Sequence, residues 1–388
     1  MKVTQSTLMD QFTSSVFGIV KHAILEKEKT GEKVVDLSLG SPDLPPDERV
    51  RKTLAEHSNN EAMYYYTLTG LERFNEAVCD YYWRRSKVKL DPQTEVLQTM
   101  GSQEGIVHLP LAFCNPGDVV LTTDPSYVAY DTGIMLARAE PYYMPLEKEN
   151  NFLPDLQAIP EEIARRAKLL ILNLPGNPVP ANPTSEFFEE VVAFAKKYNI
   201  LVLHDAAYSE YYFSGDGPIS FLSTPGAKDV GIEINSLSKS FSLAGARIAY
   251  IVGNKDAINI MKVLKSNLDY GTFAPIQEAA ITALKNAEEI TDRLRKIFTE
   301  RHRVMTDGLR TLNWEVTPSK SGMFVWAKYP FQQFDDVTFA LKTIEEVGVA
   351  MVPGSAFGSR GTGYVRIALV QDVSQLEEGI KRLGQLQL

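Results

Sequence analysis

Cysteine is scarce in this sequence. Its 388 residues include two cysteines, Cys79 and Cys114, which lie far apart and lack the spacing of a metal site. We expect two ordinary thiols in a reducing compartment and no metal. No apolar run approaches the roughly 20 residues that a membrane helix needs. The N-terminal residues 1–7 lack the apolar core of a signal peptide. We therefore expect a soluble, cytoplasmic protein with no membrane partner.

Basic stretches are also absent. The chain has 40 lysines and arginines against 49 acidic residues, a formal net charge of −9. Nucleic-acid-binding proteins carry a basic patch, so we expect no nucleic-acid partner. A small anionic substrate remains compatible with this balance, because single arginines can bind it locally.

Short apolar runs alternate with helical patterns through the middle of the chain. This alternation predicts an α/β fold with a mostly parallel sheet that is covered by helices on both faces. The expected strands are 118–122, 168–173, 199–205 and 231–235, and the clearest helix is 185–198. In such sheets, ligands gather at the carboxyl ends of the strands. Asn173, Asp205 and Ser236 lie at such ends.

The pattern differs at both ends of the chain. Residues 12–32 predict an amphipathic helix, followed by a strand at 34–39 and a loop rich in glycine and proline at 40–46. After about residue 280 a long charged helix (290–312) precedes strands that are typical of a smaller α+β domain, at 314–317, 322–327 and 363–369. We predict a large domain of residues 45–280, and a small domain made of residues 1–44 and 281–388, with an extensive interface between them.

The segment around Lys239 carries the strongest chemical signal. Ser236 and Ser238 precede the lysine, and Arg247 follows it by eight residues. Two hydroxyls and a guanidinium can hold a phosphate while the amine forms a Schiff base with an aldehyde. A single lysine is usually a surface residue, so the segment needs support from the rest of the chain. The pattern resembles the lysine segment of the class I/II aminotransferases, which use pyridoxal 5'-phosphate (PLP).

Asp205 and Tyr208 support the resemblance by their order and spacing. Asp205 ends an apolar strand, where a buried acid needs a partner. The resemblance implies that this partner is the protonated ring nitrogen of PLP, and that Tyr208 donates to the phenolic oxygen of the cofactor. The alternatives for Asp205 are a helix N-cap or an ordinary salt bridge.

Two asparagines compete for a second ring contact. The family carries an Asn-Pro-Thr-Gly loop whose asparagine binds the ring oxygen. Asn182-Pro-Thr matches this loop by its letters, whereas Asn177-Pro matches by its position directly after a strand. We choose Asn177, because a strand end fixes geometry better than letters do. Val179 and Pro180 then replace Thr-Gly, and the added prolines should stiffen the loop.

Two further segments resemble cofactor contacts. Gly101, Ser102 and Gln103 follow a strand pattern and resemble the phosphate turn of the family, where backbone N–H groups at a helix start bind the phosphate. An ordinary N-cap is the alternative. Tyr127 follows the strand at 118–122, where the family stacks an aromatic residue on the ring. Its alternative is a core position.

The resemblance also implies a second subunit. Tyr65, five residues before Gly70, matches a Tyr-x-x-x-x-Gly loop whose tyrosine reaches the phosphate of the neighbouring subunit. We therefore expect a homodimer with shared active sites, although Tyr65 could serve interface packing alone.

An arginine inside an apolar strand completes the set. Arg366 resembles the family's arginine that binds the substrate α-carboxylate as a planar, two-pronged pair. The resemblance implies that Gly40 offers its backbone to the same carboxylate and that Asn177 helps to anchor the substrate.

The resemblance extends from about residue 15 to 385 and is nearest to the LL-diaminopimelate aminotransferases and the methionine-salvage transaminases. Residues 186–199 and 225–239 are typical of that subgroup. It implies fold type I and transamination between an L-amino acid and a 2-oxo acid, with Lys239, Asp205 and Tyr208 as catalytic residues. A C–S β-lyase on the same scaffold is the alternative. A PLP-binding regulator is disfavoured by the acidic charge, and a catalytically inactive relative by the retained lysine, aspartate and arginine.

The side-chain specificity is left open by the sequence. Phe17, residues 127–130 and residues 270–273 are candidates for shaping the substrate pocket. Aspartate, alanine, methionine, aromatic amino acids and diaminopimelate all remain possible substrates.

Overall fold

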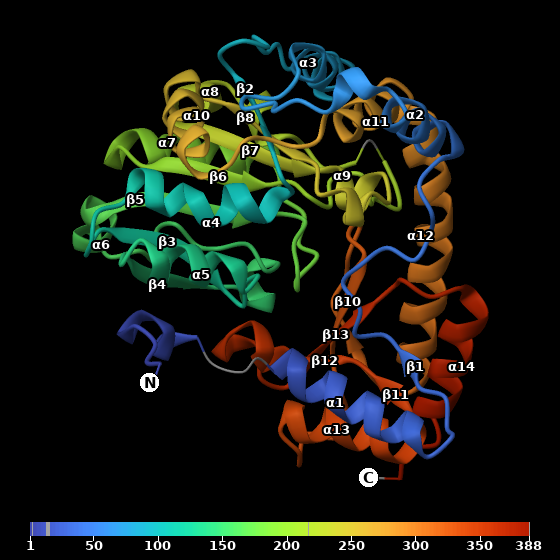
Figure 1. The fold of residues 1–388 in the computed structure, drawn as a ribbon. Helices are drawn as coiled ribbons and strands as arrows, with labels where there is room; N and C mark the ends of the chain where they lie inside the picture. The colour runs from blue at the N-terminus through green and yellow to red at the C-terminus, as the bar shows by residue number, and fades with distance from the viewer. Residues whose placement is uncertain (2, 13–15, 216, 388) are drawn as a thin grey trace.

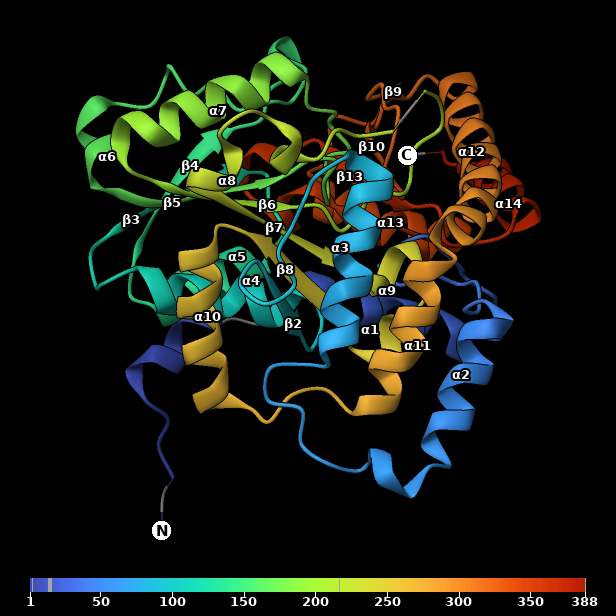
Figure 2. The same ribbon diagram turned by 90° about the horizontal axis from the view of Figure 1, so that it is seen from above.

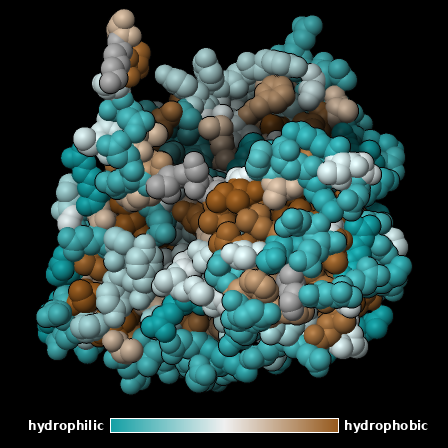
Figure 3. All heavy atoms as spheres, turned by 90° about the horizontal axis from the view of Figure 1, so that it is seen from below, coloured by the Kyte–Doolittle hydropathy of each residue, from teal (hydrophilic) through white to brown (hydrophobic). Residues whose placement is uncertain are grey.

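Two layered bodies make up the protein (Figure 1). The computed structural model describes residues 1, 3–12, 16–215 and 217–387. One body is built on a seven-stranded sheet and the other on a four-stranded sheet. Seen from below, hydrophobic residues gather near the middle of the surface within a mostly hydrophilic surround (Figure 3).

The seven-stranded sheet has the order β2-β8-β7-β6-β5-β3-β4. Its strands are β2 (Val96–Thr99), β3 (Val119–Asp124), β4 (Glu140–Pro145), β5 (Ala167–Asn173), β6 (Leu201–Asp205), β7 (Gly231–Ser236) and β8 (Ala249–Gly253). The pairs from β4 through β3, β5 and β6 to β7 are parallel, whereas β8 runs antiparallel to both of its neighbours. The predicted mostly parallel sheet is confirmed.

Helices cover both faces of this sheet (Figure 2). One face carries α4 (Ser102–Phe113), α5 (Ala129–Leu136) and α10 (Lys255–Leu268), and the other carries α3 (Glu72–Ser86), α6 (Glu161–Arg166), α7 (Ser185–Tyr198) and α8 (Ala227–Val230). Successive strand residues point to opposite faces. In β6, Val202 belongs to the hydrophobic cluster of α7, and Leu203 belongs to the cluster of α4 and α5.

The helix α7 covers the predicted range 185–198, and local chemistry explains both of its ends. The Thr184 hydroxyl accepts a hydrogen bond from the Phe187 amide, which caps the first turn. Asn199 adopts a left-handed conformation with φ of 56° and ends the helix. Phe188 and Val191 lie on the face that is buried against the sheet.

The four-stranded sheet is antiparallel, with the order β12-β13-β10-β9. Its strands are β9 (Glu315–Val316), β10 (Phe324–Lys328), β12 (Val352–Pro353) and β13 (Tyr364–Ala368), and its helices are α12 (Ala287–Thr311), α13 (Asp336–Val347) and α14 (Val373–Leu383). From the N-terminal part, β1 (Val35–Asp36) pairs with β11 (Val349–Ala350), and α1 (Val16–Lys29) packs on α13. The domain boundaries at 44/45 and 280/281 remain a prediction.

Two expected elements are shorter than the sequence pattern indicated. The helix expected at 12–32 is observed as α1, which ends at Lys29; Phe12 follows a short 3-10 helix, and residues 13–15 lie outside the described residues. The strand expected at 34–39 is only two residues long. The amide and hydroxyl of Ser38 both donate to Asp36 Oδ1, at 2.9 and 2.6 Å, which turns the chain toward the loop at 40–46.

The remaining helices pack into the hydrophobic core of the body built on the seven-stranded sheet. They are α2 (Glu48–Ser58), the short α9 (Leu237–Ser240) and α11 (Ala274–Lys285). Arg301 of α12 is 3% exposed and binds both carboxylate oxygens of Asp43, at 2.7 and 2.8 Å. This pair holds the loop at 40–46 against the small sheet and beside the ends of the central strands.

Candidate active site

A cavity of about 370 Å³ lies at the carboxyl ends of β5, β6 and β7, where the two bodies meet. It brings together most of the residues that the sequence predicted for the site. Those that line it are Gly40, Ser102, Gln103, Tyr127, Asn177, Asp205, Tyr208, Ser236, Ser238, Lys239, Arg247 and Arg366. Phe17, Ser38, Ser41, Asn173, Ala207 and Ala244 complete the lining.

One end of the cavity is suited to an anion. Arg247 lies against the start of α4, because Gly101 has no side chain; a Cβ at Gly101 would collide with the guanidinium. Gly101 also has φ of 81°, which glycine adopts at little cost. The free N–H groups of a helix start and a guanidinium both favour a phosphate. Ser102, Ser236 and Ser238 add hydroxyls to this end.

Asp205 is a buried carboxylate on the wall of the cavity, with 4% of its surface exposed. The Tyr130 hydroxyl donates to Asp205 Oδ2 at 2.9 Å, and the Ala207 amide donates to Oδ1 at 3.1 Å. Burial raises the pKa of Asp205 above its ordinary value, and these two hydrogen bonds oppose the rise. A cationic ring nitrogen would provide the partner that a buried carboxylate needs.

Arg366 connects the small sheet to the loop after β5. Its guanidinium donates to Asn177 Oδ1 at 2.8 Å and to the carbonyl oxygen of Ser38 at 2.7 Å, and it lies 4.3 Å from the ring centre of Phe324. Burial lowers the pKa of Arg366 to about 10. Since Asn177 Oδ1 accepts from Arg366, the Asn177 side-chain N–H groups are left as the donors for a ring oxygen.

The structure places the two candidate asparagines, Asn177 and Asn182, in different cavities. Asn177 lines the cavity that contains Lys239, whereas Asn182 lines a separate cavity of about 540 Å³. There the Asn182 side-chain oxygen accepts a hydrogen bond from Ser321. Of the two candidates, Asn177 alone is placed to contact a ligand beside Lys239.

Asn173 and Tyr130 are contributors to the site for which the sequence predicted no contact with the cofactor or the α-carboxylate. The Asn173 side chain donates to the carbonyl oxygen of Asp205 and accepts from the Asn177 amide, both at 2.8 Å. It therefore ties the loop after β5 to the end of β6. Its position at a strand end was the available signal. Tyr130 belongs to residues 127–130, a candidate segment for shaping the substrate pocket, but nothing in the sequence indicated its hydrogen bond to Asp205.

The amine of Lys239 donates a hydrogen bond to the carbonyl oxygen of Gly40. Burial and the positive charges of Arg366 and Arg247 lower the pKa of Lys239 to about 8, against the opposing charge of Asp205. A carbonyl oxygen and a carboxylate both only accept hydrogen bonds. Gly40 can therefore bind the substrate carboxylate only through its backbone N–H group.

The three predicted tyrosines differ in their placement. Tyr127 donates to Gln103 Oε1 at 3.4 Å, and its ring meets Tyr130 edge to face at 5.8 Å. Tyr208 lines the cavity, and burial together with the charge of Asp205 raises its pKa. Tyr65 is 51% exposed and does not line the cavity of its own chain.

Neither a metal centre nor a membrane span is found in the part of the chain that the structure describes. There, no three His, Cys, Asp or Glu side chains converge as metal ligands. No helix of these residues combines the length and the apolar character that crossing a bilayer requires.

The depressed pKa of Lys239 predicts how the cofactor-free protein should react with PLP. Its amine is protonated below pH 8 and neutral above it, and only the neutral amine attacks an aldehyde. The rate of covalent attachment should therefore rise with a midpoint near 8, well below the 10.5 of an ordinary lysine. Stopped-flow absorbance between about pH 7 and about pH 10 measures this rate. Lys239→Ala should give no covalent band, and a midpoint near 10 would contradict the placement of Lys239.

Comparison with known proteins gives the family. Residues 32–383 match the family described as aminotransferase class I and II. The LL-diaminopimelate aminotransferase of Aquifex aeolicus is 42% identical over 367 residues, covering 94% of each chain. The structure of substrate-bound BacF from Bacillus subtilis has a TM-score of 0.95 and 35% identity, covering all of this chain and 99% of that one. A probable N-succinyldiaminopimelate aminotransferase from Thermus thermophilus has a TM-score of 0.91 and 36% identity, covering 96% and 100%.

These matches support the resemblance noted from the sequence and the expected fold type I. They give no support to the C–S β-lyase alternative. The cofactor implied by the family also fits the cavity, which offers a lysine amine, a buried carboxylate and an anion site at its end. The chain belongs to the class I and II aminotransferases and is a PLP-dependent enzyme that transfers an amino group between an L-amino acid and a 2-oxo acid.

Proposed function

We propose that the amino donor of this transaminase is LL-diaminopimelate. The observation that carries the proposal is the 42% identity to LL-diaminopimelate aminotransferases over 94% or more of the chain. The cavity is compatible with a long polar substrate. Besides the residues proposed to hold the cofactor and the α-carboxylate, its lining includes the hydroxyls of Ser38 and Ser41.

Each predicted site residue has a proposed task. When bound, PLP supplies an electron sink for the bond that breaks at the substrate Cα. Lys239 Nζ removes the Cα proton, and its pKa of about 8 leaves part of the amine neutral near neutral pH. Arg366, together with Asn177 beside it, anchors the α-carboxylate, and Asp205 keeps the ring nitrogen protonated. Tyr208 and Asn177 donate to the ring oxygen.

The other proposed contacts hold the cofactor in place. Ser102, Ser236, Ser238 and Arg247, together with backbone N–H groups at Gly101 and Gln103, form the proposed phosphate site at the start of α4. The ring of Tyr127 covers the cofactor ring. Gly40 offers its N–H group to the substrate carboxylate.

Replacing Arg366 tests the carboxylate assignment. Arg366→Lys keeps the charge but removes the two-pronged geometry, so KM for the amino acid should rise about tenfold to about a hundredfold, with a smaller change in kcat. Steady-state kinetics of the PLP-loaded enzyme measure both constants. Arg360→Lys is the matched control, because that side chain is 57% exposed and pairs with Glu147. An unchanged KM in Arg366→Lys would show that another group binds the carboxylate.

A half-reaction screen tests the substrate. The PLP form is mixed with single amino acids, and the loss of its absorbance is followed. LL-diaminopimelate should react at least about tenfold faster than glutamate, phenylalanine, methionine or alanine. L-lysine lacks the distal carboxylate and L-2-aminopimelate lacks the distal amine, so these analogues show which group is recognised. A faster reaction with an aromatic or short amino acid would refute the substrate proposal and leave the transaminase assignment intact.

A homodimer with shared active sites is also proposed. Four exposed side chains form an aromatic surface patch: Tyr64, Tyr66, Tyr270 and Phe273. Within it Tyr64 packs on Phe273 and Tyr66 on Tyr270, with ring centres 5.1 and 4.9 Å apart. The two loops that carry the patch run side by side (Figure 2), joined by a hydrogen bond from the Thr67 amide to the Tyr270 carbonyl. Exposed aromatic patches of this kind are typical of protein interfaces.

Tyr65 lies in one of the loops that carry the aromatic surface patch, and it does not line the cavity of its own chain. This position is the one expected for a residue that contacts the active site of the partner subunit. The cytoplasmic location expected from the sequence stays a prediction.

Mixed dimers test the sharing of sites. Tyr65→Ala places its defect in the partner's site, whereas Lys239→Ala disables its own. In a hybrid of the two variants, one site would carry both defects and the other neither, so random exchange should restore about a quarter of the sites. Activity after unfolding and refolding the mixture is compared with that of each variant refolded alone. Activity no greater than the sum of the two separate variants would contradict a shared site.

A further inference from the structure

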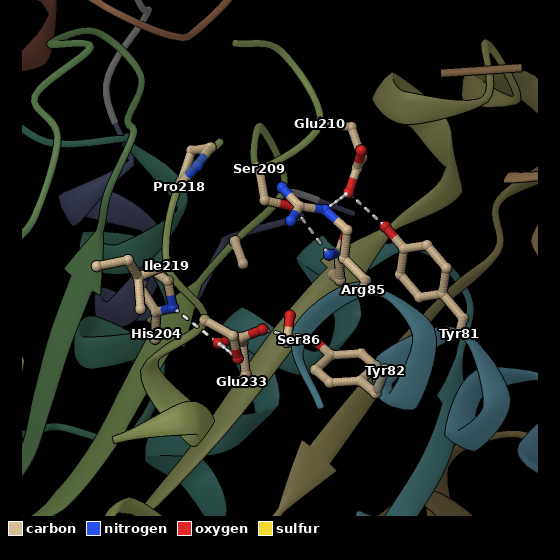
Figure 4. Close-up of a pocket in the computed structure, with 13 residues that line it drawn as sticks. Tyr81, Tyr82, Arg85, Ser86, His204, Ser209, Glu210, Pro218, Ile219 and Glu233 are labelled. Atoms are coloured by element: carbon tan, nitrogen blue, oxygen red, sulfur yellow. Dashed lines mark hydrogen bonds and ion pairs between the residues drawn. The ribbon is translucent and has the colours of Figure 1, made fainter. Parts of the chain in front are cut away.

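A third, much smaller cavity lies over the face of the central sheet that α7 covers (Figure 4). Its volume of about 20 Å³ is close to the space of one water molecule. His204 and Glu233, which are 1% and 3% exposed, point toward each other across its floor. They are neighbours in register on β6 and β7, on the face that α7 covers. The proposed chemistry of the enzyme uses neither residue.

The His204 ring lies between two hydrogen-bond acceptors. Nδ1 is 3.0 Å from Glu233 Oε2, and Nε2 is 2.8 Å from the carbonyl oxygen of Leu174. A carbonyl oxygen only accepts, so Nε2 must carry a proton. Glu233 Oε2 also accepts from the Phe221 amide at 3.0 Å. With that oxygen already occupied as an acceptor, the shared proton belongs on His204 Nδ1.

These contacts make a buried imidazolium–carboxylate pair. Tyr82 and Ser220 add hydroxyl donors to Glu233, at 2.8 and 3.0 Å, which stabilise its charged form. Burial alone would lower the pKa of His204, but the hydrogen bond and charge of Glu233 outweigh burial and leave that pKa raised. The pKa of Glu233 is lowered for the reciprocal reason, despite its own burial.

The pair reaches the cofactor cavity through the backbone. The Leu174 carbonyl that binds His204 belongs to the loop after β5, three residues before Asn177, whose side chain accepts from Arg366. His204 also directly precedes Asp205 on β6, so the two side chains leave the strand on opposite faces. Asp205 thus faces the proposed cofactor site. His204, its neighbour on β6, binds the loop after β5 from the opposite face of the sheet.

We propose that His204 is a positioning residue: held as an imidazolium by Glu233, it fixes the loop of residues 174–177 and thereby the Asn177–Arg366 pair that receives the substrate carboxylate. The proposal rests on the site roles proposed above for Asn177 and Arg366. Asn173 holds the same loop from the cavity side, by its contacts with Asp205 and Asn177. His204 supplies the second attachment, from the opposite face of the sheet.

A matched pair of variants isolates the contact with Leu174. The amide of glutamine can replace the Nε2 donor of histidine, and the shorter asparagine can replace only Nδ1. His204→Gln should therefore keep the hydrogen bond to Leu174, whereas His204→Asn should lose it. In His204→Asn we expect KM for the best amino donor to rise about threefold to about tenfold, which corresponds to the loss of one hydrogen bond. We expect a smaller change in kcat. His204→Gln should stay closer to the unchanged enzyme.

Hydrogen exchange in the cofactor-free protein gives a readout that is independent of catalysis. The amides of Gly176, Asn177 and Val179 should exchange faster in His204→Asn than in His204→Gln. Tyr82→Phe is the control, because it removes a donor to Glu233 and leaves the contacts of His204 in place. It should lower the melting temperature without changing KM or the exchange of the loop.

The possible outcomes separate the explanations. Equal exchange and equal KM in the asparagine and glutamine variants would overturn the proposal, as would a Tyr82→Phe variant that behaves like His204→Asn. If both His204 variants fail to fold, Glu233→Gln provides the test. It removes the counter-charge, so His204 should lose its Nδ1 proton and bind Leu174 only through the weaker, neutral Nε2–H donor. Exchange of the same three amides should then be faster, and unchanged exchange would refute the proposal. Because exchange needs no substrate, a failure of the diaminopimelate proposal would not affect this result.

Discussion

An excess of positive charge around the cavity at the ends of the central strands is the constraint on which the site depends. Among the described residues that line the cavity, Lys239, Arg247 and Arg366 are cationic, and Asp205 is the one carboxylate. Burial and two guanidinium groups make protonation of Lys239 unfavourable, which is why its pKa falls to about 8. A phosphate beside Arg247 and a carboxylate beside Arg366 would each neutralise a charge for which the described residues provide no ion pair. The same imbalance thus favours the two anions and keeps the amine reactive.

The site also depends on contacts between segments far apart in the sequence. Arg366 of β13 reaches Asn177 after β5 and the Ser38 carbonyl near the N-terminus, and Arg301 of α12 holds Asp43. The proposed carboxylate site is thus formed where the two bodies meet. Relative movement of the bodies would change the Arg366–Asn177 distance before it changed the distances among the residues at the ends of β6 and β7. Substrate affinity is therefore the property most exposed to such movement.

The strand ends explain why much of the site could be predicted from the sequence. Short apolar strands identify their own carboxyl ends, so Asp205, Ser236 and Asn177 could be assigned to one edge of a parallel sheet. Asn177 was chosen over Asn182 on this ground, and the two asparagines line different cavities. Tyr130, by contrast, contacts Asp205 from a separate helix. The sequence does not specify which helical face meets which strand, because tertiary packing decides it.

His204 and Glu233 show the same limit within a single sheet. A histidine and a glutamate in two apolar strands give no sign of pairing until the register of β6 against β7 is known. Once paired, they also favour that register. A shift of one residue would turn Asp205 away from the cavity, carry His204 into it, and leave the carboxylate of Glu233 buried without its imidazolium. The polar pair on one face of the sheet therefore disfavours the misregistered sheet, and it secures the position of Asp205 on the other face.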